Sequence, residues 1–332
     1  MRQLDALHPS TRRTPALVLA WALLGPVSAL AQPGLVLAPG LATPARAWIS
    51  GRVLRHAPSR GSSPLSRNLR ALGASGLPDA VVQVELLGVR VEVRTDGTGA
   101  FSAELGASDA PFTPGVHGAT ARVADTVAHA PVTVLDPAAP FLVVSDVDDT
   151  VVETHVTSRA RLLGSALLRD GLSQRAVEGM AGWYRCLVSG KSARPGLLLL
   201  SGSPLAFVPR LRTLLLREGF PTAVLWLRPS LHAPLGAHKR AALERLAAMQ
   251  PAPLLLVGDS GERDPEIYAA FRAAHPDRVL AIYIRDAGGD VGAERLEGMT
   301  LFRNPAAAAA DGAVRGWAGR DCLSAEVIGA VP

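Results

Sequence analysis

Five short apolar runs alternate with helix-like stretches through the second half of the chain, and this alternation limits the possible folds more than any other feature. The runs cover residues 141–145, 197–200, 223–227, 254–257 and 279–284, and the helical patterns cover residues 176–188, 205–217, 238–248 and 265–274. Short runs rich in Val, Leu and Ile are typical of buried strands. Their alternation with helices predicts an α/β fold, a Rossmann-like parallel sheet with helices on both faces.

Polar residues follow these elements at the points where open α/β sheets bind ligands. They are Asp146 and Asp148 after the first run, Ser201 after the second, Lys239 at the start of the third helix, and Asp259 and Asp264 after the fourth run. Carboxylates at a strand end are costly to bury without a metal or a partner. Hydroxyl, backbone N–H and ammonium groups can hold phosphate oxygens. Each piece is common by chance, whereas all four in this order point to phosphoryl transfer.

A calcium loop is the competing interpretation of the pattern Asp146-x-Asp148-x-Thr150. An EF-hand requires glycine at position six and glutamate at position twelve of its loop. Those positions hold Val151 and Thr157. The sequence therefore excludes an EF-hand here.

The same stretches resemble a known family. Residues 144–151, 200–204, 238–239, 258–268 and 279–286 resemble the haloacid-dehalogenase-like phosphohydrolases. Within that superfamily they are similar to the actin-patch-associated phosphatidate phosphatase catalytic-domain family, in its bacterial form. The resemblance covers residues 141–286.

The resemblance implies a role for each matching residue. Asp146 would be the nucleophile that forms an aspartyl-phosphate, and Asp148 would be first the general acid and then the base. Thr150 would steady the surroundings of Asp148. Ser201 would hydrogen-bond the transferring phosphoryl group, and Lys239 would offset its charge.

The resemblance also implies Mg²⁺ as the cofactor. Asp146, the backbone carbonyl of Asp148, and Asp259 would bind the ion, and Asp264 would support that metal or anchor Lys239. An all-oxygen site of this kind suits Mg²⁺.

The implied substrate is a phosphomonoester, phosphatidate in the first instance, met at a membrane surface. Where the family often has Leu-Arg-Asp, this chain has Leu227-Arg228-Pro229, a departure that bears on substrate preference. Residues 155–191 would cover the site, and their leucines would meet a lipid or form ordinary core. Two alternatives remain: a phosphatase of small soluble phosphomonoesters, and an envelope-binding module whose haloacid-dehalogenase-like domain is not catalytic.

The remaining chain divides by composition. Residues 32–46 are rich in Pro, Ala and Gly and predict a linker. Short β-like runs across residues 47–137 predict a small all-β, sandwich-like domain. Residues 140–305 form the predicted catalytic domain, and residues 306–332 a tail that is either a short closing helix or a frayed end.

Residues 1–31 read as a signal peptide. Arg12 and Arg13 precede an apolar stretch, and Ala29-Leu30-Ala31 is a small-x-small cleavage pattern. The expected location is therefore the periplasm or outside the cell, with no transmembrane segment in the mature chain.

Charge and cysteine content restrict the partners. The net charge of +5 comes without a dense basic run, so a nucleic-acid surface is not expected. Two cysteines exclude a disulfide framework. A single bridge is possible, but the apolar surroundings of Cys186 favour a buried free thiol. The oligomeric state stays open.

Overall fold

The computed structural model describes residues 32–57, 75–153, 174–189, 193–229, 235–288 and 291–328. The predicted signal peptide lies outside the described residues, as does most of the predicted cover. Ala31–Pro332 form one compact unit. The boundary proposed near residues 137–140 therefore stays a prediction, and the two parts are named here by content, as the β region and the α/β region.

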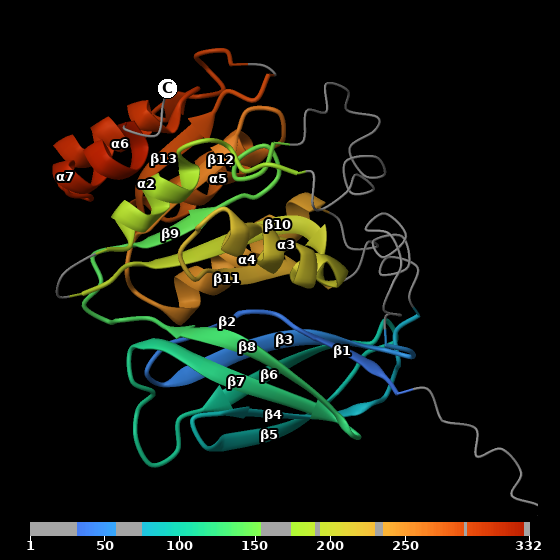
Figure 1. Cartoon of the computed structure of the whole chain (residues 1–332). Helices are drawn as coiled ribbons and strands as arrows, with labels where there is room; N and C mark the ends of the chain where they lie inside the picture. The colour runs from blue at the N-terminus through green and yellow to red at the C-terminus, as the bar shows by residue number, and fades with distance from the viewer. Residues whose placement is uncertain are drawn as a thin grey trace, which may run out of the picture. The chain divides into compact units, whose positions relative to one another are not determined.

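The described residues of the β region form eight strands (Figure 1). They are β1 Gly34–Leu37, β2 Gly40–Ala42, β3 Arg46–Leu54, β4 Val81–Leu86, β5 Val89–Arg94, β6 Ala100–Gly106, β7 Gly115–Val123 and β8 Thr126–Val134. Alternate residues point inward, as Val82, Val84 and Leu86 of β4 do, because side chains of a strand alternate between its faces.

The strands form one hydrogen-bonded sheet, where a sandwich would have two. The order is β1-β3-β2-β8-β7-β4-β5, with β6 also paired to β3. The nine-residue strand β3 makes this possible, since different parts of one edge pair with β1 and β2 while β6 pairs with residues 46–52. The predicted β content of this part is thus present, but the division into two sheets is not.

The predicted linker over residues 32–46 is wrong, because β1 and β2 lie within it. Leu35 and Val36 of β1 pair with β3, and Leu41 of β2 is fully buried between β3 and β8. Pro and Gly residues flank these strands, and the strands are too short to show a clear apolar pattern by themselves. Their pairing with neighbouring strands is what makes them part of the sheet.

The described residues of the α/β region form a parallel sheet, as predicted, but it has six strands where five were expected. The strands are β9 Leu142–Ser145, β10 Gly196–Pro204, β11 Val224–Arg228, β12 Leu254–Asp259, β13 Val279–Arg285 and β14 Thr300–Phe302. Their order is β11-β10-β9-β12-β13-β14, and every pair is parallel. Strand order reverses between β9 and β12, which is the position where doubly wound sheets bind ligands. Strand β14 was not predicted.

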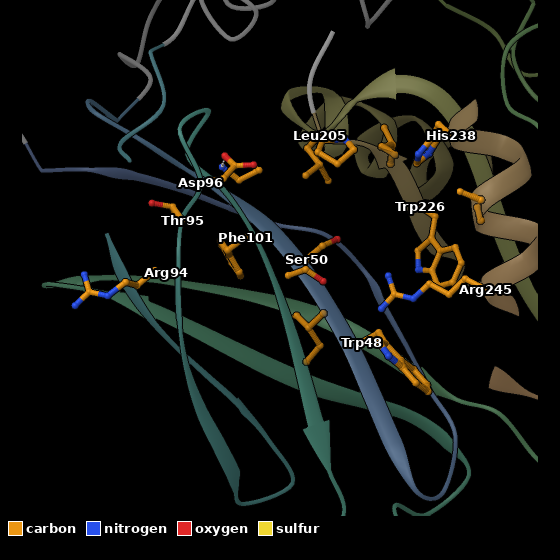
Figure 2. A pocket seen from close by; sticks show the side chains of 17 residues that line it. Trp48, Ser50, Arg94, Thr95, Asp96, Phe101, Leu205, Trp226, His238 and Arg245 are labelled. Carbon is orange, nitrogen blue, oxygen red and sulfur yellow. Dashed lines mark hydrogen bonds between the residues drawn. The ribbon is translucent and has the colours of Figure 1, made fainter. Parts of the chain in front are cut away.

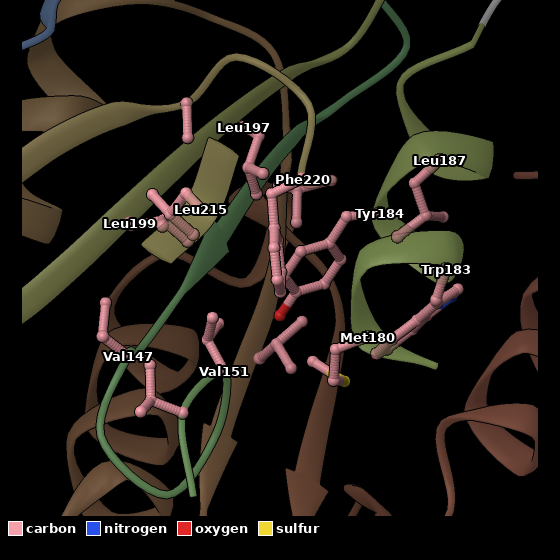
Figure 3. Packing of buried hydrophobic residues seen from close by; sticks show 14 of the residues in the cluster. Val147, Val151, Met180, Trp183, Tyr184, Leu187, Leu197, Leu199, Leu215 and Phe220 are labelled. Atoms are coloured by element: carbon pink, nitrogen blue, oxygen red, sulfur yellow. The ribbon is translucent and has the colours of Figure 1, made fainter. Parts of the chain in front are cut away.

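Helices cover both faces of this sheet. They are α2 Met180–Leu187, α3 Val208–Arg217, α4 Leu235–Met249, α5 Asp264–Ala274, α6 Pro305–Val314 and α7 Arg320–Leu323. Val143 of β9 shares a core with residues of α2, α3, α6 and α7, whereas its neighbour Val144 shares a core with α4 and α5. Figure 3 shows the first core, where Tyr184 of α2 lies beside Phe220.

The C-terminal part is not a frayed tail. Asn304 accepts a hydrogen bond from the N–H of Ala306 and so caps α6. Leu323 and Val327 are buried in the same core as α2. Residues 305–328 therefore belong to the α/β region. No helix among the described residues is long and apolar enough to span a membrane.

A disulfide joins Cys186 to Cys322, with Cα atoms 5.8 Å apart. The expected free thiol is therefore wrong, although Cys186 is buried as expected. An ion pair between Arg185 and Glu326 lies beside the bridge. The sequence could not show the pairing, because it depends on α7 packing against α2 across 136 residues.

Replacing both cysteines should destabilise the protein. A bridge that closes a loop of this length stabilises by about 2–4 kcal/mol, chiefly by restricting the unfolded chain. We expect Cys186→Ala/Cys322→Ala to lower the free energy of unfolding in urea by about that amount. Reducing agent should shift the wild-type transition in the same direction and leave the double variant unchanged; equal stability of all forms would contradict the prediction.

Candidate active site

The ends of the central strands bring the predicted site residues together. Strand β9 lies between β10 and β12, with Ser145 level with Leu199 and Val257. Asp146 follows β9, and its N–H donates to the carbonyl of Val257 at 2.9 Å. Asp259 ends β12. The two carboxylates therefore flank the point at which the strand order reverses.

Lys239, in the first turns of α4, is the centre of the site. Its Nζ lies 2.7 Å from Asp146 Oδ1, 2.5 Å from Asp264 Oδ1 and 3.3 Å from Glu262 Oε2. The Lys239 side chain is only 4% exposed. A buried ammonium needs such partners, since an unpaired charge in the interior is strongly unfavourable.

The pKa values of these groups follow from their burial and from the charges of their close neighbours. Burial raises the pKa of Asp146 well above its usual range; Lys239 opposes the shift. Burial also raises the pKa of Asp259 to about 8, with the charge of Asp264 adding to the shift. Burial alone would lower the pKa of Lys239, but the charges of Asp146 and Asp264 keep it well above its usual value. The site holds more negative charge than one lysine neutralises.

Asp148 lies among hydroxyl groups. Ser201 and Ser203 each donate to Asp148 Oδ2 at 3.2 Å, and the N–H of Ser203 donates to Ser201 Oγ. Burial raises the pKa of Asp148, and the two serine hydrogen bonds and Lys239 limit the rise. A carboxyl group with a raised pKa is suited to donate a proton.

A tight turn carries the chain from Asp146 past Asp148. The carbonyl of Val147 accepts from the N–H groups of both Val151 and Val152. Asp149 has φ of 56°, in the left-handed region that aspartate tolerates better than most residues. Arg285 donates to the Asp149 carbonyl at 2.7 Å. Asp149 therefore shapes the turn.

Two buried hydroxyl groups also support the start of this turn through hydrogen bonds. Tyr184 of α2 donates to Ser145 Oγ at 2.6 Å, and Ser145 Oγ donates to the carbonyl of Asp146 at 2.6 Å. Both side chains are fully buried. The backbone of Asp146 is thus fixed at its N–H by β12 and at its carbonyl by Ser145.

The acidic cluster could hold a divalent cation. Asp146, Glu262 and Asp264 have carboxylate oxygens within 4.8 Å of one another, but Lys239 Nζ binds all three. Two other buried oxygens, Asp146 Oδ2 and Asp259 Oδ2, have no hydrogen-bond partner among the described residues. Unpaired carboxylate oxygens are the ligands that hard cations prefer. Asp146 Oδ2 and Asp259 Oδ2 are therefore two further oxygens, besides the acidic cluster, that could contribute to holding a cation.

Most of the residues singled out from the sequence meet here. Asp264 uses Oδ1 for Lys239 and accepts at Oδ2 from the N–H of Asp259 at 3.4 Å, which is the anchoring role. Thr150 is buried, but its hydroxyl has no hydrogen-bond partner among the described residues. Sequence reasoning missed Glu262 and Ser203 as members of the site. Both lie inside the motifs already noted: Ser203 is two residues after Ser201, and Glu262 is two residues before Asp264.

Gly258 allows α5 to approach β12. A Cβ atom at this position would lie 2.6 Å from Asp264 Oδ2, 2.7 Å from Asp264 Cβ and 2.8 Å from the ring of Tyr268. Such distances force a displacement of Asp264, and Asp264 is one of the three acids that hold Lys239.

We expect Gly258→Ala to lower the free energy of unfolding by about 1–3 kcal/mol, because crowding a packed interior strains it. Gly106→Ala is a suitable control, since nothing lies within 4 Å of its Cβ position. Urea unfolding of both variants measures the difference. Equal stability of the two would show that Asp264 can move without cost.

Comparison with known proteins finds similarity in this same part of the chain. Residues 141–286 match the family model described as the catalytic domain of phosphatidate phosphatase APP1. An uncharacterized protein of Schizosaccharomyces pombe is 30% identical over 156 residues, 45% of this chain and 25% of the relative. Phosphatidate phosphatase APP1 of Saccharomyces cerevisiae is 27% identical over 150 residues, 43% of this chain and 25% of the relative.

The match thus spans about a quarter of the length of these curated relatives. Among solved structures, a carbohydrate acetylesterase from Xanthomonas citri aligns with 81% of this chain and 67% of its own, at 15% identity and a TM-score of 0.32, which is too low to support an argument. Every residue of the cluster around Lys239 lies within residues 141–286, and this part of the chain is similar to the APP1 catalytic domain.

Proposed function

We propose that residues 141–286 form a Mg²⁺-dependent phosphatase of the haloacid-dehalogenase-like type, which hydrolyses phosphatidate to diacylglycerol and phosphate. One observation carries the proposal: Lys239 holds one oxygen of the buried Asp146 carboxylate, and the other oxygen has no partner among the described residues. The family match over the same residues supports the choice of substrate.

In this mechanism the Asp146 carboxylate attacks phosphorus, and the bond from phosphorus to the glycerol oxygen breaks. Asp148 gives its proton to the departing glycerol oxygen. Water then attacks the aspartyl-phosphate, Asp148 takes a proton from that water, and the P–O bond to Asp146 breaks to release phosphate. Ser201 donates a hydrogen bond to a phosphoryl oxygen, and Lys239 balances the negative charge.

Asp146, Asp259 and the backbone carbonyl of Asp148 would hold Mg²⁺. A bound divalent cation supplies positive charge that favours ionised carboxylates and offsets phosphoryl charge. This fits the raised pKa values of Asp146 and Asp259 in the protein alone.

We also propose that the protein acts outside the cytoplasm, in the periplasm or as a secreted enzyme. The signal-like residues 1–31 motivate this location. The Cys186–Cys322 bridge supports it, because structural disulfides persist chiefly in oxidising compartments.

Asp146→Asn tests the reaction. We expect wild-type protein to release phosphate from phosphatidate in detergent micelles with Mg²⁺, and the variant to be slower by at least about a thousandfold, as nucleophile replacements usually are. Asp125→Asn is the matched control, because it makes the same substitution at an exposed position of the β region, and it should keep activity.

A panel of nucleotides and sugar phosphates separates the alternatives. Faster release from these soluble esters than from phosphatidate would favour the soluble-substrate phosphatase. A folded wild-type protein that releases phosphate from no phosphomonoester would overturn the proposal and favour the non-catalytic binding module.

Mg²⁺ should also raise the melting temperature of the wild-type protein, because a ligand that binds only the folded state stabilises it. We expect a shift of about 2 °C or more at saturating Mg²⁺. Asp259→Asn should remove this shift and Glu262→Gln should keep it. The reverse pattern would place the cation among Asp146, Glu262 and Asp264 instead.

A further inference from the structure

A cavity of about 480 Å³ lies between the β region and the edge of the parallel sheet (Figure 2). One wall comes from β3 and β6 and includes Trp48 and Ser102. The opposite wall comes from β11 and α4 and includes Trp226 and Ala241. This volume falls in the range of roughly 300–1,000 Å³ that small-molecule sites occupy.

The walls of the cavity are mainly apolar. Trp48, Trp226, Leu205 and Leu227 all line it. Figure 2 shows Arg94, Thr95 and Asp96 gathered on the side away from Trp226; of these, Arg94 and Asp96 are exposed. These three residues lie on one side of the cavity, and the tryptophans and leucines supply aromatic and aliphatic surface elsewhere in its wall.

Arg245 fixes the two walls against each other. Its guanidinium lies 5.5 Å from the ring centre of Trp226 and 6.0 Å from that of Trp48, within the range of cation–π attraction. A hydrogen bond from the N–H of Leu225 to the carbonyl of Pro39, at 3.0 Å, joins the same two regions. The cavity thus has defined walls before any ligand enters.

The cavity adjoins the candidate active site at two points. Leu227 lines it and also lines a second cavity of about 40 Å³, whose wall includes Asp148 and Ser203. His238, the neighbour of Lys239 on α4, lines the large cavity. Leu227 is therefore common to the walls of the large cavity and of the space beside Asp148.

We propose that this cavity binds an acyl chain of the substrate. The inference rests on the proposed function, in which Asp148 protonates the oxygen of the leaving group. The chains of a phosphatidate are part of that leaving group, so they extend from the Asp148 side of the site, where Leu227 and the cavity lie. The β region would then supply one wall of the substrate site.

Non-hydrolysable ligands of two lengths test this proposal without any turnover. Calorimetry would measure the binding of hexylphosphonate and dodecylphosphonate, below micelle-forming concentrations, to the full chain. Each buried methylene favours binding by about fourfold. We therefore expect the wild-type protein to bind the longer chain at least about tenfold more tightly, with a more negative heat-capacity change.

Ala241→Trp fills the cavity from α4, and we expect it to reduce the preference for the longer chain to less than about threefold. Ala248→Trp, at an exposed position of the same helix outside the cavity, should keep the preference. Ser102→Trp fills the cavity from the opposite wall and should repeat the loss, so that a folding defect in one variant does not decide the result.

Equal affinity for both chain lengths in the wild-type protein would overturn the proposal, as would an unchanged preference in the folded filling variants. Phosphate release is a separate readout. Chain-length selectivity without phosphate release would refute the phosphatase and leave the acyl-chain site standing, whereas phosphate release without selectivity would do the opposite.

Discussion

The ion pairs of Lys239 hold the α/β region together at its chemical centre. Three carboxylates from β9 and the loop and helix after β12 converge on one buried ammonium from α4. Removing Lys239 would leave these buried carboxylates without a compensating charge, which is far costlier than losing a surface pair. The same arrangement orients Asp146, because the lysine binds only one of its two oxygens. Stability and reactivity therefore depend on the same contacts.

Support for this centre comes from elements on both faces of the sheet. Tyr184 reaches it from α2 through Ser145, and Tyr268 packs over Gly258 from α5. Neither tyrosine would be near the substrate in the proposed mechanism. Their role is to hold the backbone at the ends of β9 and β12, and small displacements at such positions reduce rates strongly.

The sequence was informative where the signal is local. Apolar runs before Asp146, Ser201 and Asp259 identified strands of the parallel sheet, because each pattern fits within a few residues. It failed where an element depends on a partner outside its own residues. The short strands β1 and β2 are defined by their pairing with β3, which is distant from neither strand, and this pairing is not visible in their own residues. Cys322 meets Cys186 only because α7 packs against α2 in the folded chain. Glu262 was missed for a related reason: its carboxylate matters because α4 places Lys239 beside it.

The bridge between α2 and α7 has a consequence for how the chain is made. Translation proceeds from the N-terminus, so α2 is synthesised 136 residues before its covalent partner. Until Cys322 is synthesised, Cys186 has no covalent partner, and α2 is held only by non-covalent contacts such as Tyr184 with Phe220 and Trp183 with Tyr283. The covalent tie between α2 and the C-terminal helices can therefore form only after Cys322 has been synthesised, well after the strands and acids around Asp146.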